Sequence, residues 1–161
     1  MEQQRRDPDM LTPPAADLPC LGAALRRTAN LVTRVYNAYL APAELEVTQY
    51  SILRKIETGK AGSASELADI VGVERSTLAR NLERLEKLGL VASTPGEGRR
   101  LVYRVTPPGF ERLEAARPLW RAAQQALVDG LPADHGGQVH QELALLRKAA
   151  QAARRQNANV I

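Results

Sequence analysis

The sequence predicts a mainly α-helical fold with one small β-hairpin. Apolar residues recur every three or four positions in several segments, as they do on one face of an α-helix. Only 4% of the residues are aromatic, whereas 44% are hydrophobic. Two short apolar segments flank the turn sequence Pro95-Gly96-Glu97-Gly98, a pattern that is typical of a β-hairpin. We therefore expect helices to form most of the core.

Composition limits the classes of protein to be considered. The chain has 161 residues, near the common size of one domain, and its Pro-rich start lacks apolar periodicity. We expect a flexible N-terminal arm over 1–19 and a single domain over 20–161. The apolar runs are too short to span a bilayer, no secretory or transit signal is recognisable, and the only cysteine, Cys20, suits a reducing compartment. These observations predict a cytoplasmic protein.

The first predicted helix covers 21–40, where apolar residues are spaced three and four apart. Thr48 is expected to cap a second helix over Gln49–Thr58, because threonine is a favourable N-cap residue. Gly59 is expected to end that helix.

Two short helices joined by a tight turn are predicted next. Ser65 is expected to cap a helix over Glu66–Val71, and Gly72 supplies the left-handed turn residue. A further helix is predicted over Glu74–Leu88, before Gly89. This order is typical of a helix-turn-helix.

The hairpin and two longer helices complete the predicted fold. Strands are expected over 90–93 and 101–105. Thr106, followed by two prolines, is expected to cap a long helix that begins at residue 107 and ends before residue 130. A last helix is predicted over about 138–157.

The helix predicted over Glu74–Leu88 carries the candidate site. With about 100° per residue, its leucines define a buried face, and short polar groups followed by basic ones lie opposite. Such a face suits the major groove, where an arginine at position 80 reaches a guanine edge and the later cations contact phosphate. The candidate DNA-binding residues of this region are Ser65, Arg75, Ser76, Thr77, Arg80, Asn81, Arg84 and Lys87. A solvated helix face is the alternative.

The hairpin adds two arginines to the candidate site. Arg99 and Arg100 lie at the predicted tip, from which an arginine can enter the minor groove. A charged, soluble hairpin is the alternative interpretation. The net charge of +4 permits contact with nucleic acid without requiring it.

From Cys20 to Ile161 the chain resembles the multiple-antibiotic-resistance regulator (MarR) family of winged helix-turn-helix proteins. The resemblance is specific at Arg75-Ser76-Thr77-Leu78-Ala79-Arg80, which is similar to the family's recognition helix, and at residues 85–91, where that helix leads into a strand. Residues 105–109 are similar to the family's hydrophobic-Thr-x-x-Gly segment. The wing departs from the usual Asp-x-Arg, because Glu97 stands in place of the aspartate before Arg99.

The resemblance implies a homodimeric DNA-binding transcriptional regulator, a repressor that a small ligand or an oxidant releases from a palindromic operator. It implies a DNA-binding lobe at about 47–105 and dimerisation helices at about 20–41 and 107–158. The outer helices are also apolar and alanine-rich beyond the need of a small lobe, so they would otherwise expose a large patch. Packing within one chain is the alternative.

Two sensing sites are considered. Cys20 lies at a helix start, where the helix dipole favours a reactive thiolate, although an unreactive interface cysteine is the preferred interpretation. A ligand cleft for an aromatic carboxylate is the second hypothesis, and core packing is preferred for its tyrosines. The residues proposed for this cleft are Arg26, Arg27, Tyr36, Tyr39 and Tyr50.

Other classes of function fit the sequence less well. No nucleophile with a base, no carboxylate pair and no phosphate loop has a recognisable frame, so an enzyme is not expected. His135 and His140 lack the spacing of a metal site, and no cofactor is expected. A winged-helix module that binds protein instead of DNA remains the alternative, although such a module would be expected to lack the outward Arg80 and Arg84.

Overall fold

The computed structural model describes residues 18–59, 63–96, 100–133 and 135–158. Most of the arm predicted over 1–19 lies outside these described residues. Six α-helices and one two-stranded antiparallel sheet are found in them, which confirms the predicted fold class. None of the described helices is both long and apolar enough to cross a membrane.

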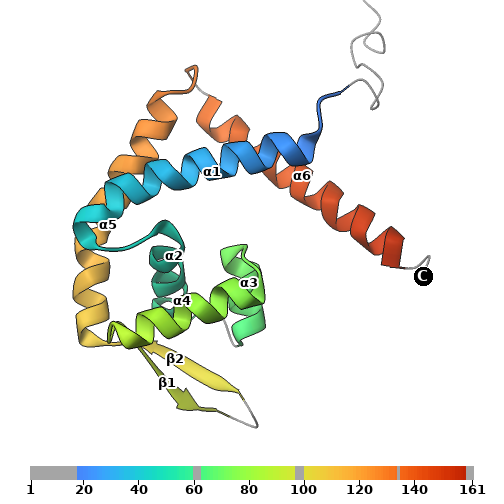
Figure 1. Ribbon diagram of the computed structural model, residues 1–161. Coiled ribbons are helices and arrows are strands. Elements are labelled where there is room, and N and C mark those ends of the chain that lie inside the picture. The colour runs from blue at the N-terminus through green and yellow to red at the C-terminus, as the bar shows by residue number, and fades with distance from the viewer. Residues whose placement is uncertain (1–17, 60–62, 97–99, 134, 159–161) are drawn as a thin grey trace, which may run out of the picture.

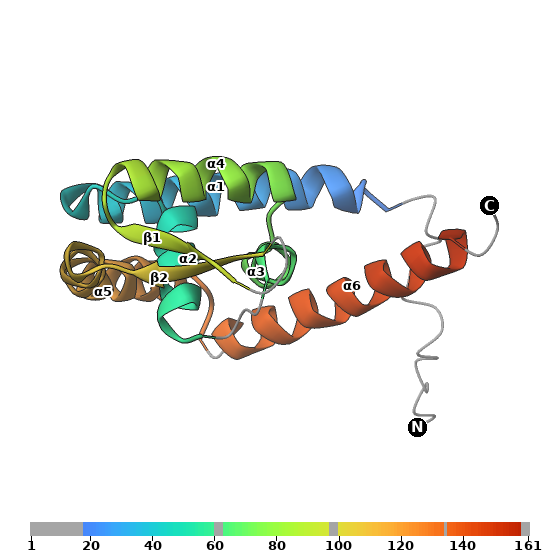
Figure 2. The same ribbon diagram turned by 90° about the horizontal axis from the view of Figure 1, so that it is seen from below.

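The elements of the central lobe are α2 (Val47–Glu57), α3 (Ala64–Val71), α4 (Arg75–Lys87), β1 (Val91–Pro95) and β2 (Leu101–Val105). Gly72 ends α3 at φ 79° and turns the chain into α4, as the sequence predicts. Leucines of α3 and α4 pack with the apolar face of α2 into one core. Seen from below, α4 and the hairpin lie in front of α1, α2 and α5 (Figure 2).

Three longer helices frame this lobe: α1 (Leu21–Leu40), α5 (Pro107–Asp129) and α6 (His135–Ala158). A 3₁₀ turn, η3 (Ala41–Ala43), joins α1 to the lobe. The helix α5 rises from the hairpin past α2 and α1 to the start of α6, which then leads away from the lobe (Figure 1). Pro118 lies inside α5 and has no amide hydrogen to donate to the carbonyl one turn before it.

The structure corrects the predicted start of α2. Glu46, and not Thr48, is the N-cap, and the helix runs over Val47–Glu57 instead of Gln49–Thr58. The backbone amide of Glu46 donates to Oε1 of Gln49, and the amide of Val47 donates to Oδ1 of Asn37 on α1 at 2.8 Å. These side chains satisfy amides that a helix N-terminus otherwise leaves without a partner.

Three further boundaries are corrected. Ser63, and not Ser65, caps α3, because its hydroxyl accepts a hydrogen bond from the amide of Glu66 at 3.1 Å. The helix therefore begins at Ala64, two residues before the predicted start. The last helix, α6, begins at His135, three residues before the predicted start. The first strand runs to Pro95, beyond its predicted end.

Thr106 joins the hairpin to α5. Its side chain accepts from the amide of Gly109 at 3.1 Å, which confirms the predicted cap, and its hydroxyl donates to the carbonyl of Gly89. Its own amide donates to the carbonyl of Leu90. The buried Gly109 lies so close to the base of the hairpin that a Cβ atom there would overlap the carbonyl oxygen of Leu90 and lie 2.8 Å from Cγ1 of Val105 in β2.

We predict that Gly109→Ala lowers the free energy of unfolding by about 3 kcal/mol, since the new methyl group can be accommodated only if the backbone moves. Chemical denaturation measures the loss. Gly137→Ala is the matched control, because a Cβ atom at this position of α6 meets nothing within 4 Å. Equal effects of the two substitutions would show that close packing at Gly109 is not what requires glycine.

Candidate DNA interface

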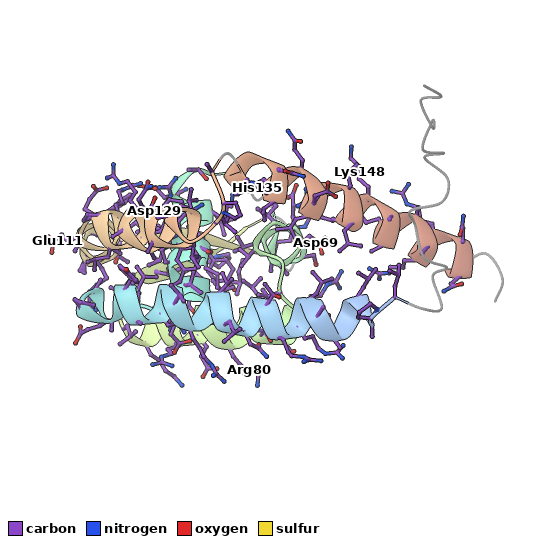
Figure 3. The ribbon with its side chains drawn as sticks, turned by 90° about the horizontal axis from the view of Figure 1, so that it is seen from above. Asp69, Arg80, Glu111, Asp129, His135 and Lys148 are labelled. Carbon is purple, nitrogen blue, oxygen red and sulfur yellow. The ribbon has the colours of Figure 1, made fainter. Side chains whose placement is uncertain are left out.

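The helix α4 buries one side and exposes the other. Leu78, Leu82 and Leu85 are at most 3% exposed and hold the helix in the lobe core. The opposite side carries the exposed Ser76 and Arg80, with other polar residues beside them. Arg80 projects outward, away from the rest of the chain (Figure 3). The predicted division of this helix into an apolar and a polar face is therefore present.

The first two turns of α4 carry two arginines, Arg75 and Arg80. Within the described part of the chain, neither Arg75 nor Arg80 forms an ion pair. Nη2 of Arg80 donates a long hydrogen bond of 3.4 Å to the hydroxyl of Thr77, one turn earlier. The half-buried Asn81 uses its amide group on the carbonyl of Thr77 at 2.8 Å. Arg80 is thus directed outward with most of its donors available, whereas Asn81 is partly engaged by its own helix.

The later cations of α4 each face a carboxylate. Nη1 of Arg84 lies 3.4 Å from Oε1 of Glu46 on the neighbouring α2 N-terminus. Nζ of Lys87 lies 2.7 Å from Oε1 of Glu83, and this contact lowers the pKa of the Glu83 carboxyl. All four side chains are more than half exposed, so each pair contributes little to stability and each cation remains accessible to a phosphate.

The wing lies beside α4. The strands pair from Val91 opposite Val105 to Pro95 opposite Leu101, and the amide of Gly96 donates to the carbonyl of Arg100 beyond the last pair. The side chain of Arg100 is exposed. Arg99 and Glu97 lie outside the described residues.

Ser65 lies in the first turn of α3 and is half-buried. It lines shallow hollows that also border Arg100 of the wing and Arg75 of α4. Although it does not cap the helix, it lies close to two of the predicted DNA-binding residues.

An aromatic stack joins α1, α5 and α2. Trp120 of α5 stacks on Tyr36 of α1, with ring centroids 6.3 Å apart, and on Tyr50 of α2, with centroids 5.9 Å apart. The hydroxyl of Tyr36 donates to Oε1 of Gln124, and partial burial raises the pKa of Tyr36, so this hydroxyl keeps its proton at neutral pH. The stack brings together two of the five residues predicted to line a ligand cleft.

The other three residues of that prediction are placed differently. Tyr39, Arg26 and Arg27 are exposed on α1. Arg27 lies nine residues before Tyr36, about 14 Å along the helix axis, and the guanidinium of Arg26 lies over Gly22 on its own helix. Within one chain, none of these three side chains lines the cleft that Tyr50 borders.

A cleft of about 230 Å³ does adjoin the aromatic stack, with a different set of arginines. Arg117 donates to Glu114 at 2.6 Å and to Glu57 at 2.5 Å, and these contacts, above all the one with Glu114, raise its pKa. The hydroxyl of Tyr50 is buried and has no hydrogen-bond partner within the described residues. The residues that line the cleft are Tyr50, Arg54, Arg117, Trp120 and Arg121. A buried hydroxyl without a partner is unfavourable, which makes it a candidate donor to a ligand.

Cys20 is the N-cap of α1 and is exposed. Its carbonyl accepts from the amides of Ala23 and Ala24, both at 3.1 Å. Nothing among the described residues covers the thiol, so it is accessible as the sensing hypothesis requires.

A helix-turn-helix with an outward basic face, followed by a hairpin wing, defines a winged-helix DNA-binding protein. Comparison with known proteins agrees with this class. The model of the MarR family matches residues 45–102. The Multiple antibiotic resistance protein MarR of Salmonella typhimurium is 30% identical over 118 residues, which cover 71% of this chain and 81% of that protein. The chain therefore belongs to the MarR family, and it is a DNA-binding transcriptional regulator and not an enzyme.

Two solved structures extend the similarity to most of the chain. The transcriptional regulator MosR of Mycobacterium tuberculosis in complex with DNA is 35% identical, with a TM-score of 0.75, and 84% of this chain and 99% of that chain are covered. The Mycobacterium tuberculosis MarR family protein Rv2887 in complex with salicylic acid is 27% identical, with a TM-score of 0.62, and 81% and 98% are covered.

Several residues of the candidate sites were not predicted from the sequence. Glu46 stands three residues before Gln49, a spacing that is similar to a capping box and that identifies the true start of α2. Trp120, Arg54 and Arg121 lie on two helices that are distant in sequence, and no local pattern connects them.

Proposed function

We propose that the protein binds a palindromic DNA site as a homodimer, represses transcription there, and is released by a small effector. The observation that carries this proposal is the outer face of α4, where Arg80 projects from the lobe without an acidic partner among the described residues. A helix of this kind enters the major groove by its N-terminal end. The relative MosR, solved in complex with DNA, supports DNA binding by this chain.

Arg80 is the proposed base-reading residue. It lies on the second turn of α4 beside the small Ser76 and Thr77, which permit close approach to base edges. An arginine at this place can donate two hydrogen bonds to one guanine. Arg84 and Lys87, in the last turn, are proposed to contact phosphate, and Arg99 and Arg100 to contact the adjacent minor groove.

We predict that Arg80→Ala weakens binding to a duplex selected by the wild-type protein from a random pool by about tenfold or more, because one bidentate base contact is lost. Binding to a scrambled duplex of the same composition is expected to fall much less. Lys87→Ala is the control and is expected to weaken both equally. Fluorescence anisotropy titration measures the four affinities. An unchanged affinity ratio in Arg80→Ala would contradict the assignment, and a wild-type protein with no preferred duplex would favour the protein-interaction module.

Dimerisation is proposed from the outer helices. No described side chain of α6 is buried, although Val139, Leu143 and Leu145 are large and apolar. Leu21 and Leu31 of α1 are likewise more than half exposed. A helix of 24 residues that has no fully buried side chain among those described, and only Gly136, Ala144 and Leu146 half-buried, needs a partner. A second copy that covers these faces would set two α4 helices about 34 Å apart, one turn of DNA.

We predict that Leu143→Arg yields a monomer that has lost most of its operator affinity, because a charge on the proposed interface cannot be buried without a partner. Sedimentation velocity measures the mass, and anisotropy measures DNA binding. Gln151→Arg adds the same charge to the same helix at an exposed position away from the face of Val139, Leu143 and Leu145, and is expected to stay dimeric. A dimeric Leu143→Arg variant would remove this face of α6 from the interface.

The effector is proposed to be a small carboxylate with an apolar body. The cleft beside Trp120 offers the hydroxyl of Tyr50, which has no partner among the described residues, and the guanidinium groups of Arg54 and Arg121. Nε of Arg54 lies 3.9 Å from Oε2 of Glu57, a long contact that leaves its other donors available. Arg117 is held by two carboxylates, so it helps to shape the cleft. Because the cleft lies where α2 of the lobe meets α5, a ligand there is placed to change the orientation of α4. The salicylic acid complex of Rv2887 supports this class of ligand.

We predict that salicylate changes the fluorescence of Trp120, the only tryptophan of the chain, and releases the selected duplex. Tyr50→Phe is expected to weaken salicylate binding about fivefold, the value of one hydrogen bond, without loss of stability, because its hydroxyl has no partner among the described residues. Tyr39→Phe, on the exposed side of α1, is the control. Equal effects of both would contradict the cleft.

If peroxide releases DNA in wild type but not in Cys20→Ser, and salicylate does not, the effector is an oxidant.

A further inference from the structure

We infer that Glu46 determines specificity in DNA binding by restraining Arg84. The inference rests on the proposed function, in which Arg84 contacts phosphate. Glu46 and Arg84 are 38 residues apart in sequence, and their side chains meet at 3.4 Å on the surface that the proposal turns toward DNA. The sequence of α4 alone does not indicate that a carboxylate of another element lies beside Arg84.

The backbone of Glu46 is firmly held. Its amide donates to Oε1 of Gln49 at 3.0 Å, and Gln49 is only 1% exposed. Leu45, immediately before it, is 3% exposed and belongs to the lobe core. The carboxylate therefore projects from a fixed point of the lobe, and Arg84 is held relative to the lobe as a whole.

The second ion pair of α4 is different in this respect. Glu83 and Lys87 lie one turn apart on the same helix, so this pair does not connect α4 to another element. Both carboxylates subtract one charge from the same surface. Only Glu46 restricts the positions that its arginine can reach.

This restraint affects the two kinds of DNA complex differently. Non-specific binding depends on the number of cations that are free to neutralise phosphates wherever they lie, and a paired Arg84 contributes less to it. In the operator complex α4 is seated at one depth and angle, so the phosphate opposite Arg84 has a fixed position. Arg84 has five donors and makes one contact with Glu46, so a preset guanidinium loses less side-chain entropy on reaching that phosphate. Glu46 thus lowers non-specific affinity while it leaves operator affinity nearly unchanged.

The test uses full-length wild type, Glu46→Gln and Glu83→Gln with two probes, a duplex selected by the wild-type protein and its scrambled counterpart. Glu46→Gln keeps the size of the side chain and an acceptor oxygen at the start of α2. It is expected to raise affinity for the scrambled duplex about threefold for a dimer with two such pairs, with little change for the selected duplex. Its salt dependence on the scrambled duplex is expected to steepen by about 0.9 per protomer. Glu83→Gln removes the same charge and is expected to raise both affinities alike.

Arg84→Gln, alone and combined with Glu46→Gln, completes the test as a double-mutant cycle. If Glu46 acts through Arg84, the effect of Glu46→Gln on the affinity ratio vanishes in the Arg84→Gln background. A ratio that falls equally in both backgrounds, or a Glu46→Gln variant that behaves as Glu83→Gln does, overturns the inference. A wild-type protein that prefers no duplex overturns the proposed function itself, and this result is seen before any variant is compared.

Discussion

Burial of three leucines on one side of α4 is the constraint on which the candidate interface depends. Truncation of a buried leucine costs about 2–5 kcal/mol, whereas an exposed ion pair contributes about 0–1 kcal/mol. Packing of Leu78, Leu82 and Leu85 therefore fixes the rotation of α4 about its axis, and the charges on its outer face adapt to that rotation. Arg80 points outward because the leucines point inward. The contact of Arg84 with Glu46 adjusts a surface whose orientation is already set.

The fold was predictable where the deciding contacts are local. Apolar spacing gave the bounds of α1, and Thr106 and Gly72 were recognisable from their neighbours. The start of α2 was not, because the amide of Val47 is satisfied by Asn37 of another helix, and this contact forms only after the chain has folded. The start of α3 was ambiguous for a different reason: two serines stand two residues apart, and both are chemically able to cap a helix.

The same distinction separates the parts of the candidate site. The outward residues of α4 follow from the period of one helix, so the sequence was sufficient to choose them. The cleft beside Trp120 combines α2 with α5, and the pair of Glu46 with Arg84 combines α2 with α4. Arginines on α1 were predicted for the cleft because a guanidinium suits an aromatic carboxylate, whereas the structure supplies Arg54 and Arg121 from helices that meet in space.

The proline inside α5 affects how easily this helix bends. Before Pro118, Leu113 and Ala116 belong to the lobe core; after it, Trp120 and Gln124 contact Tyr36 of α1, while Trp120 also stacks on Tyr50 of the lobe. Because one backbone hydrogen bond is missing between these halves, α5 bends more easily at Pro118 than elsewhere along its length. A tilt of about 10° there displaces its first turn, 11 residues away, by about 3 Å. A displacement of that size is comparable to a hydrogen-bond length. A small change in the bend of α5 at Pro118 is therefore enough to break a hydrogen bond between a side chain of the lobe and a base pair.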